Sequence, residues 1–125
     1  IVFIHGAGGS IRTWKRQVGA LQQHAKLLLL DLRDHGASEP VSPSPTQYDF
    51  ELISNDIKKV MDHLEISKAH FITLSLGSVL IQDFSMRYPS YIGSVVMAGG
   101  VFKANFILKC FILRHKKPSQ ISLSL

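Results

Sequence analysis

The sequence predicts an α/β protein in which a parallel sheet carries helices on both faces. Three observations lead to this class. Short, mostly apolar runs recur along the chain, as expected for strands that are buried on both sides. Stretches with apolar residues at helical spacing separate these runs. The two kinds of element alternate, and this alternation is typical of right-handed βαβ crossovers.

Four strands are expected. They cover residues 1–4, 27–30, 70–74 and 95–98, and the last strand ends at the glycine pair 99–100. Each run is short and dominated by large aliphatic or aromatic side chains, which suits the middle of a parallel sheet.

Two helices are expected in the first half of the chain. The first covers residue 13 to about residue 24, with Trp14, Val18 and Leu21 at helical spacing. The second follows Asp49, because an aspartate is a favourable N-cap. Its apolar stripe predicts a face that packs on the sheet, and consists of Phe50, Ile53, Ile57, Val60, Met61 and Leu64.

A third helix and two loops complete the expected elements. The helix covers residues 76–87 and ends before Pro89, because the residue that precedes a proline disfavours helix. A glycine-rich loop at residues 5–10 follows the first strand. Another expected loop, residues 33–48, contains Gly36 and three prolines.

The composition indicates one folded domain without a nucleic-acid-binding face. The chain has 125 residues, of which 46% are hydrophobic and 18% charged. A single cysteine, Cys110, excludes an internal disulfide. All 9 acidic residues and 9 of the 14 basic ones precede residue 100, so the net charge of +5 comes from the end of the chain. A nucleic-acid interface would spread its charge over a folded surface, so we expect no nucleic acid partner.

The ends of the chain suggest part of a longer, cytoplasmic protein. Residues 1–4 read as the middle of a buried strand, with neither an initiator methionine nor the basic region of a signal peptide before them. The apolar stretch 101–113 is too short to span a membrane and contains Lys103 and Lys109. Residues 101–117 suit a lid helix over an apolar pocket or a membrane-surface helix, and we expect no membrane contact.

Three of the expected strands are followed by unusual polar or glycine-rich motifs. These are HGAGGS at residues 5–10, DLRDHGAS at residues 31–38 and TLSLG at residues 73–77. The carboxyl ends of parallel strands lie at one edge of a sheet, which is where open α/β proteins bind their ligands.

In order and placement, the three motifs resemble the serine-nucleophile branch of the α/β-hydrolase superfamily, of the AB hydrolase-1 type. HGAGGS, followed by Trp14, is similar to the HG-x-G oxyanion loop of that family. DLRDHGAS is similar to its D-x-R-G-x-G-x-S loop, with Asp34 in place of a glycine. TLSLG is similar to the nucleophile elbow, with Thr73 in place of the first glycine, where it is expected to crowd the neighbouring helix. The resemblance covers about residues 1–103.

The resemblance implies a nucleophile and an oxyanion hole. Ser75 would be the nucleophile, on a sharp turn between a strand and a helix. The backbone N–H groups of Ala7 and Leu76 would hold the oxyanion. A lone serine at such a place is more often a simple turn or cap residue, and it is the three motifs in order that favour a nucleophile. The supporting motif residues are His5, Gly6 and Gly77, while Asp31, Arg33 and His35 are expected to stabilise the loops.

The triad acid and histidine are not expected in this chain. After Ser75 the acid is Asp83, within the following helix, and the histidine is His115, in the basic tail. The family order is serine, then acid, then histidine. We therefore expect residues 1–102 to be a core fragment of a longer hydrolase, and residues 103–125 to begin a cap or lid or to be a non-native tail.

The predicted function is a serine-dependent hydrolase that acts on a carboxylic ester or a related acyl or carbon–carbon bond. The expected partner is a small, apolar ester or acyl compound, and no metal or organic cofactor is implied. The isolated chain is expected to turn over little substrate. The alternative is a non-catalytic protein of the same fold that binds a small ligand. A carboxylate and then a histidine downstream in the full-length protein would favour the enzyme.

Overall fold

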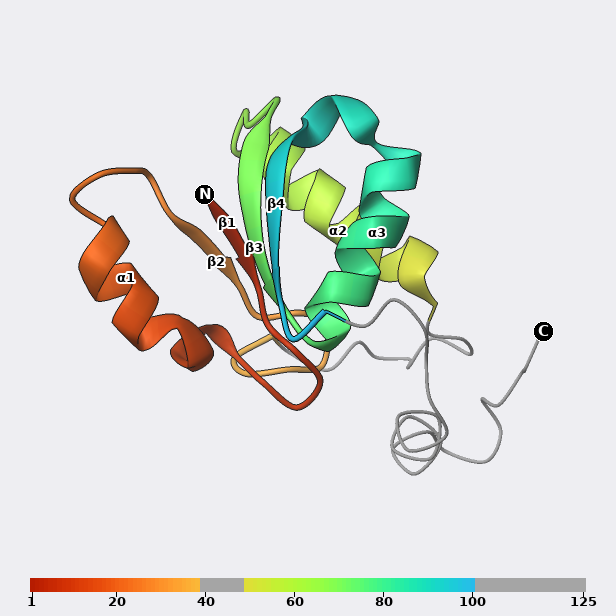
Figure 1. Cartoon of the computed structure of the whole chain (residues 1–125). Coiled ribbons are helices and arrows are strands. Elements are labelled where there is room, and N and C mark those ends of the chain that lie inside the picture. The colour runs from red at the N-terminus through yellow and green to blue at the C-terminus, as the bar shows by residue number, and fades with distance from the viewer. Residues whose placement is uncertain (39–48, 101–125) are drawn as a thin grey trace.

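The computed structural model describes residues 1–38 and 49–100, which form one parallel sheet flanked by helices (Figure 1). The 4 strands are β1 (Val2–Ile4), β2 (Leu28–Leu30), β3 (Ala69–Leu74) and β4 (Ile92–Ala98), in the order β2-β1-β3-β4. The predicted fold class is therefore confirmed. The expected boundary between core and tail at residues 102 and 103 lies outside the described residues.

All neighbouring strands are parallel and closely in register. Val2 of β1 pairs with Leu28 of β2 on one side and with Phe71 of β3 on the other. On the far side of β3, Thr73 pairs with Met97 of β4. The carboxyl ends of the 4 strands consequently lie at the same edge of the sheet, at the bottom of Figure 1.

The helices lie on both faces of the sheet, as Figure 1 shows. One face carries the 3-10 helix η1 (Ile11–Trp14) and α1 (Lys15–Leu21), and the opposite face carries α2 (Phe50–His63) and α3 (Leu76–Arg87). A short 3-10 turn, η2 (Pro89–Tyr91), connects α3 to β4. Within the described part of the chain, no helix has the length and apolar character needed to cross a membrane.

The first helix differs from the expected single helix over residues 13–24. Ser10 and Thr13 form a capping box that starts a 3-10 turn, and the α-helical part ends at Leu21. The capping box explains the early start, because it satisfies N–H groups that have no partner inside the helix. Trp14 is buried, with its ring centroid 5.1 Å from that of Phe3.

The last strand begins at Ile92, three residues before the expected start at residue 95. Ile92 pairs with Ala69, and the register shifts between Ala69 and His70. The early start thus depends on pairing with β3, which is distant in the sequence, and the apolar pattern of residues 92–98 alone does not reveal that pairing.

The second helix begins after Asp49 as predicted, but its apolar stripe is buried only in the middle. Ile57 and Met61 pack in the core, whereas Phe50 and Leu64 at the two ends are exposed, contrary to the prediction.

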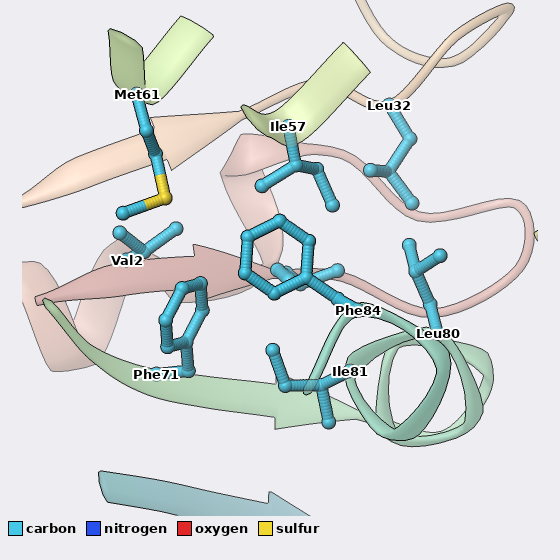
Figure 2. Packing of buried hydrophobic residues seen from close by; sticks show 9 residues of the cluster. Val2, Leu32, Ile57, Met61, Phe71, Leu80, Ile81 and Phe84 are labelled. Carbon is cyan, nitrogen blue, oxygen red and sulfur yellow. The ribbon is translucent and has the colours of Figure 1, made fainter. Parts of the chain in front are cut away.

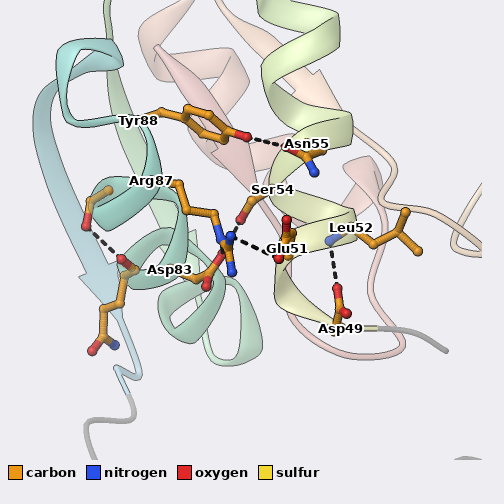
Figure 3. A network of polar contacts seen from close by, with 10 residues as sticks. Asp49, Glu51, Leu52, Ser54, Asn55, Asp83, Arg87 and Tyr88 are labelled. Carbon is orange, nitrogen blue, oxygen red and sulfur yellow. Dashed lines mark hydrogen bonds and ion pairs between the residues drawn. The ribbon is translucent and has the colours of Figure 1, made fainter.

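The Asp49 carboxylate accepts a 2.8 Å hydrogen bond from the N–H of Leu52, as predicted for an N-cap (Figure 3). At the other end, Glu65 has a φ of 56°, and the N–H of Ile66 donates to the carbonyl of Met61 at 2.8 Å. This is the hydrogen-bond pattern of a Schellman motif, formed with glutamate where glycine is usual.

The core lies between the sheet and the α2–α3 layer (Figure 2). Phe84 of α3 is fully buried there, and its ring centroid lies 5.5 Å from that of Phe71 and 5.3 Å from that of Tyr88. The buried cluster consists of Val2, Ile4, Leu32, Ile57, Met61, Phe71, Leu80, Ile81 and Phe84.

A polar network also joins α2 to α3 (Figure 3). The Asp83 carboxylate accepts hydrogen bonds at 2.8 Å from both the buried hydroxyl of Ser54 and the guanidinium of Arg87. Arg87 also forms a 3.1 Å ion pair with Glu51, and the hydroxyl of Tyr88 binds Asn55. Asp83 therefore faces the neighbouring helix.

We predict that Phe84→Ala lowers the free energy of unfolding by about 3–5 kcal/mol, because it leaves a cavity in the middle of the core. The matched control is Met86→Ala on the same helix, where the side chain is 77% exposed and the expected change is within about 0.5 kcal/mol. Urea unfolding of both variants is the measurement. Equal midpoints for the two variants would contradict the placement of α3.

Candidate active site

Three connections meet at the carboxyl edge of the sheet. We call residues 5–10, after β1, the first loop, and residues 31–38, after β2, the second loop. The third connection is the junction between β3 and α3 at Ser75. Figure 1 shows all three at the bottom of the molecule. The predicted convergence of the three sequence motifs is therefore found.

Ser75 has a strained backbone at the junction between β3 and α3. Its φ is 50° and its ψ is −113°, which is unusual for a residue with a side chain. Its N–H donates to the carbonyl of Ala98 at 3.0 Å, and its carbonyl accepts from the N–H of Ser78 at 2.8 Å. Such a conformation costs on the order of 1–3 kcal/mol and persists only where the surroundings hold it. Contacts on both sides of Ser75 supply that support.

The start of α3 passes over the carboxyl end of β1. Gly77 is buried, and a Cβ at this position would lie 2.6 Å from the carbonyl oxygen of Ile4 and 2.8 Å from that of His5. Leu76 is the first residue of the helix, so its N–H has no partner four residues earlier within the helix. The positive end of the helix dipole lies at the same place.

The first loop brings its glycines against the β3–α3 junction. A Cβ on Gly6 would lie 3.2 Å from the Cβ of Ser75. The N–H of Gly9 donates to the carbonyl of Gly6 at 3.0 Å and closes a turn, in which Gly8 has a φ of 68°. Ala7 is exposed on this turn, next to Gly6. The sequence-predicted residues of the first loop and of the junction are thus neighbours.

His5 holds the two loops together from the interior. Its side chain is fully buried, with Nδ1 2.8 Å from the carbonyl oxygen of Gly6 and Nε2 3.1 Å from the N–H of Leu32, which donates to it. A carbonyl only accepts, so Nδ1 carries the hydrogen and the ring is neutral. Burial lowers the pKa of His5 below its ordinary 6.5. The structural role predicted for His5 is consistent with these contacts.

His35 makes a second connection between the loops, consistent with the expected loop-stabilising role, although its partner Gly8 was not predicted. Its Nδ1 lies 2.9 Å from the carbonyl oxygen of Arg33, and its Nε2 lies 3.2 Å from the N–H of Gly8. The ring centroids of His5 and His35 are 5.1 Å apart. Both histidines of these loops have both ring nitrogens engaged with the backbone, so neither offers a free base to Ser75.

The charged side chains of the second loop are also bound. The Asp31 carboxylate accepts from the N–H of Ile11 at 2.7 Å and of Ala37 at 2.9 Å. The Ala37 hydrogen bond, and then that of Ile11, hold the pKa of Asp31 below its usual value. Arg33 binds Asp56 of α2 with two nitrogens, at 2.8 and 2.7 Å. Over residues 1–38 and 49–100, no three His, Cys, Asp or Glu side chains gather as a metal site would require.

Thr73 does not crowd the neighbouring helix, contrary to expectation. It is fully buried, and its hydroxyl lies 3.1 Å from the hydroxyl of Ser78 in α3 and 3.3 Å from the carbonyl oxygen of Val96 in β4. A threonine fits this position because the facing residue of the helix is a small one with a matching hydroxyl. The side chain therefore joins β3 to α3.

The chain is similar to hydrolases of one family. The model of the family described as alpha/beta hydrolase fold matches residues 1–123. The 3-oxoadipate enol-lactonase 2 of Acinetobacter baylyi is 28% identical over 104 residues, which are 82% of this chain and 38% of that protein. The 2-hydroxy-6-oxononadienedioate/2-hydroxy-6-oxononatrienedioate hydrolase of Escherichia coli is 30% identical over 104 residues, which are 80% and 35% of the two chains.

Solved structures agree with the sequence relatives. The structure of a hydrolase from Pseudomonas aeruginosa superimposes with a TM-score of 0.79 at 28% identity, and the match covers 90% of this chain and 41% of that one. The chain thus spans about two fifths of the length of the proteins it matches.

We predict opposite effects for two glycine-to-alanine changes. Gly77→Ala places a methyl group 2.6 Å from a backbone oxygen and should lower the free energy of unfolding by about 1–3 kcal/mol. Gly19→Ala in α1 meets nothing within 4 Å and should raise it by about 0.5–1 kcal/mol. Chemical unfolding of both variants is the measurement. A Gly77→Ala variant as stable as the parent would refute the close approach of α3 to β1.

We predict that protonation of His5 contributes to acid destabilisation. Its pKa is lower in the folded state than the ordinary 6.5, so the unfolded chain binds the proton more readily. The contribution to stability is complete above about pH 6.5 and is lost as the pH falls through the lower folded value. Unfolding free energies measured from pH 8 to pH 5 should show this loss.

Two variants isolate that contribution. His5→Gln should have a flatter pH dependence over the same interval, whereas His63→Gln, at an exposed position, should keep the parental slope. Identical slopes for the parent and His5→Gln would show that another group is responsible.

Proposed function

The chain belongs to the α/β-hydrolase family, and from this premise we propose that it carries the nucleophile and the oxyanion hole of a serine-dependent hydrolase. The observation that supports this most is the backbone of Ser75, whose φ of 50° and ψ of −113° lie at the junction of β3 and α3. A nucleophile elbow requires such a strained turn, because it exposes the serine above the sheet. An ordinary cap residue has no need of the strain.

The proposed reaction begins with attack by the Ser75 Oγ on the carbonyl carbon of the substrate. The Oγ proton passes to a general base, and the carbonyl oxygen becomes an oxyanion. The N–H groups of Leu76 and Ala7 stabilise that oxyanion, a contribution of roughly 2.7–4 kcal/mol for each donor. Expulsion of the protonated leaving group gives an acyl-enzyme, which water hydrolyses to the acid and free Ser75.

The general base and its acid are assigned to a part of the protein outside the described residues. His5 and His35 both use their two ring nitrogens in backbone hydrogen bonds, and Asp83 faces α2. A serine hydroxyl is a weak nucleophile without a base. Turnover by the proposed enzyme therefore depends on a carboxylate and a histidine that approach Ser75 from that part.

The proposed substrate is a small molecule with a carboxylic ester or a related acyl or carbon–carbon bond. One relative is named as an enol-lactonase, and a lactone is a cyclic ester. Another is named as a hydrolase of an unsaturated 2-hydroxy-6-oxo diacid. Both names describe small, carbonyl-containing molecules, which is the chemistry that an oxyanion hole serves.

We predict that a fluorophosphonate probe labels Ser75 in the protein that contains this chain together with its base. The probe forms a covalent bond to an activated serine, so Ser75→Ala should abolish labelling at this position. Peptide mass spectrometry after labelling is the measurement. Ser90→Ala, at an exposed position within η2, is the control and should be labelled like the parent.

The opposite outcome favours the alternative function. A folded protein that binds small ligands but is not labelled at Ser75 would be a non-catalytic member of the fold. Labelling that persists in Ser75→Ala would place the nucleophile elsewhere.

A further inference from the structure

We propose that His35 is a positioning residue for the oxyanion turn, which it holds through the N–H of Gly8. The effect on catalysis rests on the proposed function, whereas the hydrogen bond between His35 and Gly8 does not. The imidazole lies in the second loop and the turn in the first, 27 residues apart. His35 would act on the reaction only through the position of the Ala7 N–H.

The hydrogen-bond geometry fixes the tautomer of His35. Its Nδ1 lies 2.9 Å from the carbonyl oxygen of Arg33, which can only accept. Nδ1 therefore carries the hydrogen, and Nε2 presents a lone pair. The N–H of Gly8 donates to that lone pair at 3.2 Å. The neutral ring thus accepts a hydrogen bond from the first loop at Nε2 and donates one within the second loop from Nδ1.

The apex of the turn needs such a contact because packing does not hold it. A Cβ on Gly8 would meet no atom within 4 Å, and both Ala7 and Gly8 are exposed. The ends of the turn are fixed differently, since Gly6 lies against Ser75 and Gly9 lies against His5. The hydrogen bond to His35 ties the apex of this exposed turn to the second loop.

The same bond selects which N–H of the turn can serve the substrate. Gly8 donates to His35, and Gly9 donates to the carbonyl of Gly6. Of three consecutive N–H groups, those of Gly8 and Gly9 are thereby occupied, and the N–H of Ala7 is assigned to the oxyanion. Loss of the His35 contact frees the peptide group between Ala7 and Gly8 to rotate.

The connection requires a neutral His35. A second proton on the ring turns Nε2 into a donor, which cannot accept from an N–H. His5 faces the ring from the first loop at 5.1 Å between centroids, and Asp31 lies at the start of the second loop. Arg33 and Asp34 precede His35 in its own loop. Protonation is therefore expected to release the turn.

The first experiment detects the contact between His35 and Gly8 by NMR in protein labelled with ¹⁵N. The nitrogen shifts of the His35 ring report its tautomer, and the Gly8 amide should show coupling to Nε2 across the hydrogen bond. A Gly8 amide without that coupling, or a neutral ring protonated at Nε2, would overturn the proposal, whatever the protein hydrolyses.

The second experiment compares three variants. His35→Leu removes the acceptor, His35→Gln keeps an acceptor near the position of Nε2, and His24→Leu removes an exposed imidazole elsewhere. In His35→Leu the Gly8 amide should exchange about three- to tenfold faster, the range expected for one lost hydrogen bond, and kcat for an activated ester should fall by a similar factor with little change in KM. His35→Gln and His24→Leu should stay close to the parent.

The two readouts separate the two ideas. Faster exchange at Gly8 in His35→Leu, in a protein without any Ser75-dependent hydrolysis, would support the His35 contact and refute the proposed function. Unchanged exchange in a folded His35→Leu protein would refute the positioning role, even if the protein is an active hydrolase.

Discussion

The first turn of α3 passes over the carboxyl end of β1 at the distance of backbone contact. A Cβ on Gly77 would lie only 2.6 Å from the carbonyl oxygen of Ile4, so the position accepts no side chain. Ser75 and Leu76 directly precede this contact and take their positions from it. On the other side of the junction, a Cβ on Gly6 would lie 3.2 Å from the Cβ of Ser75. The place of Ser75 is thus set by close contacts between main-chain atoms, which a change of side-chain rotamer cannot relieve.

The loops around this contact are held in place by side-chain hydrogen bonds. Two hydrogen bonds cross between them, through His5 and His35, and a third joins Asp31 of the second loop to the N–H of Ile11 at the start of η1. In each case a side chain accepts a backbone N–H. Because backbone donors in exposed loops otherwise bind water, these acceptors replace solvent with fixed partners. The two loops are consequently joined to each other at the carboxyl edge of the sheet.

The sequence predicted the parts of the structure that local chemistry determines. The order of strands and helices follows from apolar spacing, and the cap at Asp49 follows from its own side chain. The start of β4 at Ile92 was missed because it depends on pairing with Ala69, a distant residue. In the site, the motif around Ser75 indicated the strained junction, whereas the contact of His35 joins residues 27 positions apart. No spacing rule connects those two residues.

The polar network between α2 and α3 lies at the opposite end of α3 from Ser75. That helix has 12 residues, which is about 18 Å of rigid rod. The position of α3 along α2 is fixed by the hydrogen bonds of Asp83 with Arg87 and with the buried Ser54. A helix of this length moves as a rigid body, so a shift of α3 along α2 would move the N–H groups of its first turn as well. The polar contacts at one end of the helix therefore help to set the position of a backbone donor at the other end.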